Sequence, residues 1–305
     1  MTAPSDEERL SSPDSVRGRM QRTALDWLRK KEANGEIPTN LRFLFYELEQ
    51  AGEVSKNTVK LDGTPGKRKP SADLTSAVTH LRNIGLIPWD WIVDESRHIQ
   101  SWNYGRTVLD CVLENVDYSS LDRFPDVPRP VLLCESRAIG GVLERTVALE
   151  YLVTVIPTGG QANGFLRTQA ARQLAEFLKE GEVLPLYIGD HDDAGNDIEA
   201  NTRRVLEHAC QHTFDNWERL MLTDEQCRML KRRGVQPIEK TDKRYKDGNP
   251  HLAYEAEALG QKLVTQIVRD RLEALAPVPL DEIQEREKEQ IEEVKKLLTT
   301  KGKKR

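Results

Sequence analysis

Two stretches of the sequence decide the fold: Val131-Leu132-Leu133-Cys134-Glu135 and Leu184-Pro185-Leu186-Tyr187-Ile188-Gly189-Asp190-His191-Asp192. Each is an apolar run typical of a buried strand, and each ends in acidic residues. In an open parallel α/β sheet, ligands bind at the carboxyl ends of the strands. Three carboxylates converging there, Glu135, Asp190 and Asp192, predict a site for a hard divalent cation. Mg²⁺ fits best, because it takes a few carboxylate oxygens and keeps waters or substrate phosphates as its other ligands. The pattern therefore indicates phosphodiester chemistry.

The bulk composition limits the class of protein. The chain has 305 residues, of which 31% are charged and 38% hydrophobic, and its net charge is −5. This length suits one large domain or two medium ones, and the acidic balance excludes a polybasic DNA coat, so contact with nucleic acid must use local basic patches. The widely spaced cysteines form no CxxC pair, which indicates neither a zinc knuckle nor a disulfide framework: Cys111, Cys134, Cys210 and Cys227.

Two further features of the sequence concern its location in the cell. No apolar run approaches the length of about 20 residues that spans a membrane. The N-terminus is rich in Ser, Asp and Glu and lacks the basic-then-apolar layout of a signal peptide. We therefore expect a cytoplasmic protein without a membrane partner, associated with the nucleoid if it acts on DNA.

The N-terminal part of the chain predicts a small helical domain. Residues 1–15 are expected to be a flexible lead, and residues 16–34 form a basic amphipathic helix. Two apolar stripes at helical spacing follow, separated by a turn-rich basic loop at 52–72: Leu41, Leu44, Phe45 and Leu48, with Asn40 as the cap, and then Leu74, Ala77, Val78 and Leu81. Three helices and a basic loop predict a winged-helix domain over residues 16–123, with the run 87–93 packing against it or forming its wing.

After a Pro-rich linker at 124–130 the pattern changes. Strand-like runs alternate with helical stretches, which favours a parallel α/β sheet: the strands at 131–134, 151–156, 184–188 and 218–222, the helices near 138–150, 167–180 and 195–211. Thr223-Asp224-Glu225-Gln226 has the form of a capping box that opens another helix, and residues 252–275 are strongly helical. We expect an α/β domain with C-terminal helices over 131–280 and a charged helical tail over 281–305.

These motifs resemble a known family. An acid after one strand and Asp-x-Asp after a later strand resemble the Toprim domain of topoisomerases, primases, recombination mediators and nucleases. Within residues 20–275, three segments are similar to the A subunit of DNA topoisomerase VI and its relative, the meiotic double-strand-break transesterase. They are Arg42-Phe43-Leu44-Phe45-Tyr46, Pro157-Thr158-Gly159-Gly160 before Leu166-Arg167-Thr168, and Glu255-Ala256-Glu257-Ala258-Leu259 after Lys240-Thr241-Asp242-Lys243-Arg244.

The resemblance implies a mechanism and an assembly. Tyr46 would attack a phosphate held by Arg42 and leave a phosphotyrosyl link, while Glu135, Asp190 and Asp192 hold Mg²⁺ and assist the leaving hydroxyl. It also implies a homodimer in which the tyrosine of one protomer meets the Toprim domain of the other. Strand passage driven by ATP would need a separate ATPase subunit.

The residues themselves support some of these roles. Tyr46 is expected to fall off the buried stripe and to lie one turn from Arg42, because positions i and i+4 are neighbours on a helix. A tyrosine with an ordinary pKa near 10 is a weak nucleophile at neutral pH, and an arginine beside it would favour the phenolate. The alternatives remain a partly buried structural tyrosine and, for Glu135, a first-turn acid that favours the helix dipole.

Contact with DNA is predicted for the basic loop and the third helix, through Lys67, Arg68, Lys69 and Arg82. The alternative is an exposed, solvated loop. Three functions stay open at this stage: a Mg²⁺-dependent transesterase that cleaves DNA, a hydrolytic Toprim nuclease in which the metal activates water and Tyr46 is structural, and a DNA-binding regulatory protein without catalysis.

Overall fold

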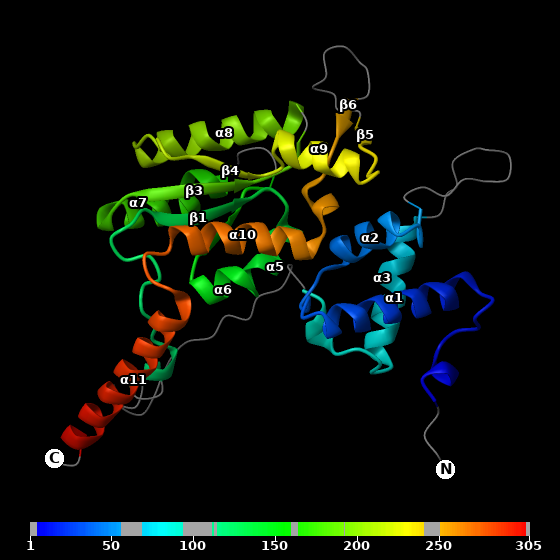
Figure 1. Cartoon of the computed structure of the whole chain (residues 1–305), viewed down its shortest axis with the longest axis horizontal. Helices are drawn as coiled ribbons and strands as arrows, with labels where there is room; N and C mark the ends of the chain where they lie inside the picture. The colour runs from blue at the N-terminus through cyan, green and yellow to red at the C-terminus, as the bar shows by residue number, and fades with distance from the viewer. Residues whose placement is uncertain are drawn as a thin grey trace.

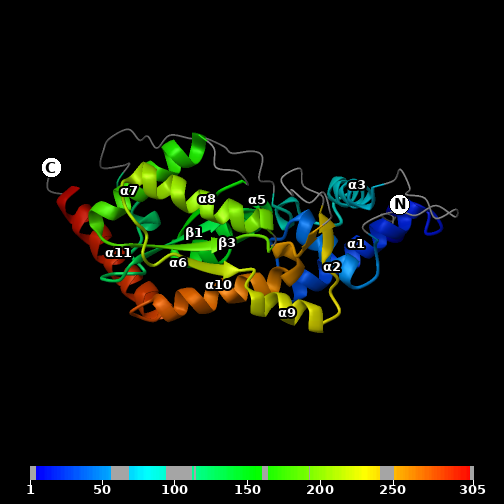
Figure 2. The same cartoon turned by 90° about the horizontal axis from the view of Figure 1, so that it is seen from above.

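The computed structural model describes residues 5–55, 69–93, 112, 115–159, 164–191, 193–240 and 251–302. The molecule is elongated, with the N-terminal helices at one end, a parallel sheet in the middle and the C-terminal helix at the other end (Figures 1 and 2). We call the described residues 5–93 the helical module and those from 115 to the end of α10 the sheet domain.

The helical module contains the three predicted helices, α1 (Val16–Ala33), α2 (Leu41–Gln50) and α3 (Pro70–Asn83). Their apolar stripes meet in one core that includes Leu28, Leu44 and Leu81, all fully buried. Asn40 caps α2 as expected, because its Oδ1 accepts the backbone N–H groups of Arg42 and Phe43 at 2.8 and 2.9 Å. The sequence pattern therefore predicted these helices and their packing faces.

The run 87–93 packs against the helices without forming a hairpin. It contains a short 3₁₀ helix, η2 (Trp89–Trp91), and Ile92 forms an isolated parallel bridge with Thr39. Within residues 69–93 no strand of a wing is present, and the residues immediately beyond 93 lie outside the described part. The helices are thus established, whereas the winged-helix assignment stays a proposal.

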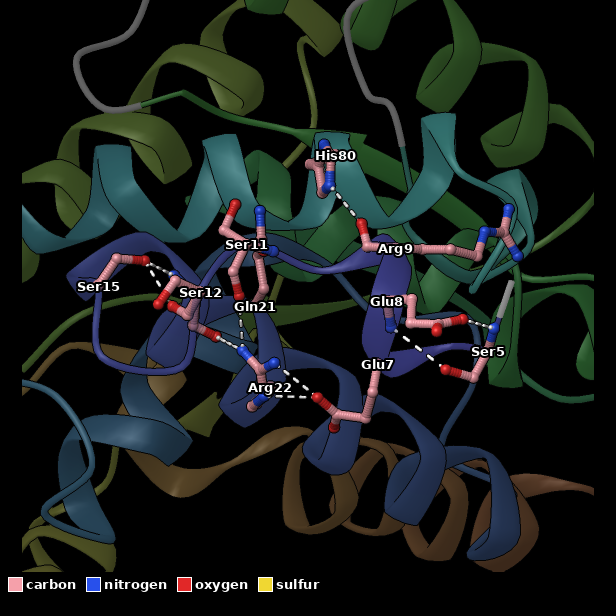
Figure 3. Close-up of polar contacts among 11 residues, drawn as sticks. Ser5, Glu7, Glu8, Arg9, Ser11, Ser12, Ser15, Gln21, Arg22 and His80 are labelled. Carbon is pink, nitrogen blue, oxygen red and sulfur yellow. Dashed lines mark hydrogen bonds and ion pairs between the residues drawn. The ribbon is translucent and has the colours of Figure 1, made fainter.

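Residues 5–15, expected to be a flexible lead, lie across α1 and α3 (Figure 3). A short 3₁₀ helix, η1 (Glu7–Arg9), brings Glu7 to Arg22 at 2.6 Å, and the His80 ring contacts the Arg9 carbonyl oxygen at 3.4 Å. Gly18 makes this path possible, since a Cβ there would lie 2.0 Å from the carbonyl oxygen of Ser12. Specific contacts therefore hold the segment on the module.

The sheet has four parallel strands in the order β2-β1-β3-β4. They are β1 (Arg129–Cys134), β2 (Thr154–Pro157), β3 (Val183–Ile188) and β4 (Glu218–Met221). Cys134 at the end of β1 pairs with Pro157 on one side and with Ile188 on the other. The strands therefore end level with one another, and we call this border the carboxyl edge.

Helices cover both faces of the sheet (Figure 1). On one face lie α5 (Arg137–Glu144), α6 (Val147–Tyr151) and α10 (Gln261–Leu275); on the other lie η4 (Leu166–Ala170), α7 (Ala171–Glu180) and α8 (Asp193–Cys210). Successive side chains of a strand point to opposite faces. Leu132 accordingly joins the core with α5 and α10, while Leu133 joins the core with α7 and α8. The predicted α/β class is confirmed.

Several predicted boundaries were wrong by a few residues. β1 begins at Arg129, inside the expected linker 124–130. Tyr151 ends helix α6 instead of starting a strand, because Leu152 adopts a left-handed conformation with φ 55° that terminates the helix. The stretch 252–275 is not all helix: it starts in β6 (His251–Ala253), which pairs with β5 (Ile238–Lys240), and continues through the 3₁₀ helix η5 (Ala256–Leu259).

The remaining helices follow the predictions. Thr223 and Gln226 form the expected capping box at the start of α9 (Asp224–Arg232). The charged tail is α11 (Leu280–Gly302), which leaves the body at the end opposite the helical module (Figures 1 and 2). Its first turns are fixed by buried Ile283 and by the ion pair between Arg123 and Glu287 at 2.9 Å. Of the helices in the described residues, none has the length and apolar character needed to cross a lipid bilayer.

Candidate active site at the carboxyl edge

The strand order creates one distinctive position on the carboxyl edge. From β1 the chain passes to β2 on one side, and from β2 it crosses to β3 on the other side of β1. The connections after β1 and β3 therefore diverge, which makes a topological switch point, and ligands of open α/β sheets bind in the crevice at such a point. Glu135 directly follows β1, and Gly189-Asp190 directly follow β3.

Glu135 and Asp190 are brought together by the backbone. The Glu135 N–H donates to the Ile188 carbonyl at 2.8 Å, and the Asp190 N–H donates to Glu135 Oε2 at 3.3 Å. The Tyr187 hydroxyl also approaches Glu135 Oε2, at 3.5 Å. Gly189 allows this approach, because a Cβ there would lie 2.6 Å from Tyr187 Cε1 and 2.9 Å from Glu135 Oε2. The structure thus joins two of the three predicted acids.

Asp190 is held from two further directions. Its Oδ1 accepts the Ala256 N–H at 3.0 Å, and its carbonyl oxygen accepts a hydrogen bond from Arg219 Nη2. Arg219 also pairs with Glu199, donates from Nε to the Leu222 carbonyl at 2.9 Å and stacks over the Tyr187 ring. Sequence reasoning missed Arg219, because a charged residue in a short strand gives no signal that it reaches a neighbouring loop.

Arg42 reaches this edge from the helical module. Its Nε lies 3.0 Å from Glu257 Oε1 and its Nη2 lies 3.4 Å from Glu255 Oε1. Burial lowers the pKa of Arg42, but the carboxylates of Glu257 and Glu255, with Asp190 and Glu135 beyond them, outweigh burial and raise the pKa overall. The guanidinium is therefore a positive charge that is paired with Glu257 and Glu255 and lies near Asp190 and Glu135.

Glu257 and Glu255 support this arginine. The Glu257 side chain is fully buried, and its Oε1 accepts both Arg42 Nε and the Ser136 hydroxyl, the latter at 2.6 Å. A buried carboxylate is stable only when it is paired and hydrogen-bonded. Burial raises the pKa of Glu255, to which Glu257 adds while Arg42 opposes it. The structure places both residues against Arg42.

Tyr46 departs from its expected position. It was predicted to fall off the buried stripe, but its exposed fraction is only 8% and its ring packs edge-on against Phe45. The reason is tertiary: α2 docks against η5, where Gln50 Nε2 donates to the Ala258 carbonyl at 2.8 Å, so a second face of the helix is buried.

A cavity of about 440 Å³ adjoins this tyrosine. Its walls come from α2, from the end of α9 with the segment that follows, and from β6 with η5; they include Tyr46, Glu49, Arg233, Tyr254 and Glu255. Glu255 therefore lines this cavity and also pairs with Arg42. Glu135 and Asp190 are not among the described residues that line it.

The other predicted contacts are only partly placed. Asp192, Lys67 and Arg68 lie outside the described residues, and Lys69 is exposed just before α3. Arg82, for which contact with DNA stays a prediction, has partners within the helical module. Its Nη2 donates to the carbonyls of Trp89 and Ile92, and the guanidinium lies 5.0 Å over the Trp89 ring. The polar face of α3 gave no indication that η2 would fold back against the Arg82 side chain.

His191 connects the edge to α9 and β6. Its backbone exchanges hydrogen bonds with Tyr254 at 3.0 and 3.3 Å, and its Nε2 lies 2.8 Å from Asp224 Oδ1 at the start of α9. The hydrogen bond from His191, together with its charge, lowers the pKa of Asp224. The N-terminus of α9 is therefore next to the residues that follow β3.

The donor set suits a hard cation. Glu135 and Asp190 both lie at the switch point, where Glu135 Oε2 accepts the Asp190 N–H and Asp190 Oδ1 accepts the Ala256 N–H. Mg²⁺ is usually held by one or two carboxylates with waters and substrate phosphates. Among the described residues, no group of three or more His, Cys, Asp or Glu side chains is arranged to hold a metal ion. The two carboxylates fit a Mg²⁺ site that substrate would complete, and Asp192 stays a predicted third ligand.

No protein-family model, no curated protein and no solved structure matches this chain. The functional argument therefore rests on the carboxyl edge and on the motifs in the sequence.

Proposed function

We propose that this protein cleaves DNA strands with the help of Mg²⁺, in the manner of the topoisomerase VI A subunit. In this proposal the sheet domain is a Toprim domain and the helical module is a winged-helix domain that binds DNA. The observation that carries the proposal is the meeting of Glu135 and Asp190 at the switch point, with the Arg42 guanidinium in front of them.

Arg42 and the two acids have complementary tasks in this chemistry. A phosphodiester entering the edge would meet the guanidinium, which binds phosphate oxygens in a planar, two-pronged geometry. Glu135 and Asp190 would hold Mg²⁺, which when bound neutralises charge on the transferring phosphate. Glu255 and Glu257 keep Arg42 at the edge through their ion pairs, so the arginine is oriented before DNA arrives.

The proposed nucleophile is Tyr46, on the turn of α2 that follows Arg42. Its phenolic oxygen would form a bond to phosphorus while the bond to the deoxyribose oxygen breaks. The phenolic proton would pass to solvent or a carboxylate, and the departing oxygen would take up a proton. The product is a phosphotyrosyl link and a free DNA hydroxyl. Because Tyr46 is mostly buried, the scissile phosphate must enter the cavity that it borders.

Hydrolysis is the second candidate, and one observation favours it. Tyr46 is 8% exposed, and neither Glu135 nor Asp190 is among the described residues around its cavity. In a hydrolytic nuclease, water activated at the edge would attack the phosphate and Tyr46 would only pack the interface. A DNA-binding protein without catalysis is the third candidate, and it requires that Glu135 and Asp190 have no catalytic role.

The test is a cleavage assay on supercoiled plasmid with Mg²⁺, stopped with denaturant and analysed with and without protease digestion. Transesterification predicts cut DNA that enters the gel only after proteolysis and is lost in Tyr46→Phe. Tyr254→Phe is the matched control, since Tyr254 borders the same cavity. Protease-independent cutting that survives Tyr46→Phe would establish hydrolysis instead.

Acid variants complete the assay. Glu135→Gln and Asp190→Asn should abolish cutting under either catalytic reading, because each removes a charged oxygen ligand of the proposed metal site. If both variants cut like the wild type, the carboxyl edge is not the active site.

The implied homodimer can be tested by mixing inactive subunits. Tyr46→Phe and Asp190→Asn proteins should regain cutting together only if the tyrosine of one protomer serves the edge of its partner. In the described chain Arg42 contacts the edge of its own protomer. Action within one chain would leave the mixture inactive.

A further inference from the structure

The C-terminal half of α9 carries four cations that the predicted DNA contacts do not include. Arg228, Lys231, Arg232 and Arg233 are all exposed, and no acidic residue falls between 228 and 233. None of the four forms an ion pair with the described residues, in contrast to Arg219 on β4 and Arg271 on α10. In a chain with a net charge of −5, this is a local excess of positive charge.

The helix dipole does not account for the whole cluster. Cations in the last turn of a helix are stabilised by the dipole, and this explains Lys231 and Arg232. Arg228 lies in the middle of α9, and Arg233 follows its last residue. Arg228 lies one turn after Asp224, and its charge adds to the effect of His191 in lowering the pKa of that carboxyl. The dipole and this neighbour favour single cations, whereas the gathering of four exposed ones needs another explanation.

The position of α9 supplies an explanation for these exposed cations. The helix begins at Asp224, which contacts His191 beside the proposed metal ligand Asp190. It ends at Arg232, and the next residue, Arg233, lines the cavity beside Tyr46. A helix rises 1.5 Å per residue, so the eight steps from Asp224 to Arg232 span about 12 Å. One DNA strand rises 3.4 Å per nucleotide. The helix therefore covers about three to four nucleotides next to the carboxyl edge.

We propose that α9 is a phosphate-binding surface that holds the DNA strand beside the scissile bond, with Arg228, Lys231, Arg232 and Arg233 as its contacts. The proposal rests on the proposed function and adds the path of the DNA. The strand runs along α9 between the acidic edge and the cavity at Tyr46. The contacts are to phosphates, so they position the DNA and do not select its sequence.

Equilibrium DNA binding without divalent cations tests this surface separately from cleavage. The patch variant carries Lys231→Gln, Arg232→Gln and Arg233→Gln. The control carries Lys179→Gln, Arg286→Gln and Lys288→Gln, which removes the same charge from exposed positions at the end of α7 and on α11. Fluorescence anisotropy of a short labelled duplex over a range of salt gives the affinity and its salt dependence. Circular dichroism verifies that both variants are folded.

The patch variant should bind at least about tenfold more weakly and lose about three units of slope in log K against log salt, because each phosphate contact contributes about 0.9. The control should stay within about twofold of the wild type. Equal binding and slope in the patch variant and the control would overturn the proposal for α9.

The two proposals can fail separately. A wild type that cleaves DNA while the patch variant binds normally would refute the α9 surface and leave the active site standing. A patch variant that loses binding while no protein cleaves would establish the surface and count against the cleavage function. A wild type that binds no DNA at any salt would overturn both.

Discussion

Gly189 shows how a single residue sets the geometry of the edge. Its missing side chain leaves room for the Tyr187 ring and for Glu135 Oε2, which would lie 2.6 and 2.9 Å from a Cβ atom. The Tyr187 ring is fully buried and stacks on Trp217, so it cannot easily move away. The close approach is therefore a requirement of the site and not a flexible turn.

Gly189→Ala should destabilise the protein by about 1–3 kcal/mol, the usual cost of overpacking, and should weaken Mn²⁺ binding by displacing Glu135. Gly164→Ala is the control, because a Cβ there has no neighbour within 4 Å. Urea unfolding and Mn²⁺ titration measure the two effects. Equal stability and metal affinity for the two variants would contradict this account of Gly189.

The environment of Glu255 predicts the direction in which the stability of the protein changes with pH. Burial raises its folded-state pKa above the ordinary value of 4.5, with Glu257 adding and Arg42 opposing. Ionisation of Glu255 therefore opposes folding. The stability it contributes is fully present below the ordinary pKa and is lost as the pH rises through the folded-state pKa.

Glu255→Gln, which is neutral at every pH, should gain stability over the wild type as the pH rises from about 4.5 to neutrality. The two proteins should converge below that range. Urea unfolding at several pH values measures the difference, with the exposed Glu285→Gln as the control. A difference that is constant with pH, or that has the opposite sign, would show that the Arg42 pair outweighs burial at Glu255.

At the scale of elements, Asn40 performs two functions. Its Oδ1 caps α2, and its Nδ2 donates to the Ala138 carbonyl at 2.6 Å in the first turn of α5. One side chain therefore starts the helix that carries Arg42 and Tyr46 and also fastens it to the helix that follows Glu135. The position of α2 relative to the edge depends on this residue.

Asn40→Ala should cost about 1–2 kcal/mol for the lost cap and about 1 kcal/mol more for the lost hydrogen bond to α5. Asn40→Ser retains a cap oxygen and loses the amide donor, so it should be intermediate. The free energy of unfolding for both variants tests this division. A serine variant as stable as the wild type would mean that the contact with Ala138 contributes nothing.

Elements with strong periodicity could be predicted from the sequence, and those defined by docking could not. The stripe on α2, its Asn40 cap and the buried runs of β1 and β3 follow from local pattern. The sequence predicted helix at β6, because this strand of three residues pairs only with β5 and is too short to show an alternation of apolar and polar residues. The burial of Tyr46 and the contacts of Arg82 could not be predicted for the same reason, since they involve segments distant in the sequence or a returning turn.

At the scale of the whole molecule, a set of polar contacts joins the helical module to the sheet domain. Within the module, buried Lys31 pairs with Glu36 and Glu47, at 3.2 and 2.8 Å, and Glu47 Oε1 in turn accepts the Gln261 N–H of the sheet domain at 3.3 Å. Gln261 at the start of α10 donates to the carbonyls of Glu36 and Pro38. Together with Arg42–Glu257 and Gln50–Ala258, these contacts lead us to expect that the two parts unfold as one cooperative unit.

Hydrogen exchange can test this coupling. Peptides of α1–α3 and of β1 and β3 should show similar opening free energies in the wild type, because contiguous packed elements open together. Gln261→Ala should lower protection in α1–α3 more than in the sheet, since it leaves the Glu36 and Pro38 carbonyls without their donor. Gln169→Ala, at an exposed position on η4, is the control.

Two independently exchanging halves in the wild type would contradict the single unit. Equal loss of protection in both parts of the Gln261→Ala protein would contradict the expected larger effect on α1–α3. Unchanged protection in both parts would show that Gln261 is dispensable for docking.

The sequence predicts the part of the candidate site that directly follows strands β1 and β3. Glu135 and Asp190 could be paired in advance, because parallel strands end at a common edge. The strand order that creates the switch point, the buried pairing of Glu257 with Arg42 and the hold of Arg219 on Asp190 depend on tertiary packing. No spacing in the sequence encodes them.

The direction of α11 bears on how this protein can be studied one molecule at a time. The helix leaves the body at the end away from the helical module (Figures 1 and 2), while Arg42 places the carboxyl edge on the side of that module. A biotin or a surface linker attached to the last turns of α11 would therefore leave the edge facing the solution. Immobilised in this orientation, single molecules could meet a stretched DNA without obstruction from the support.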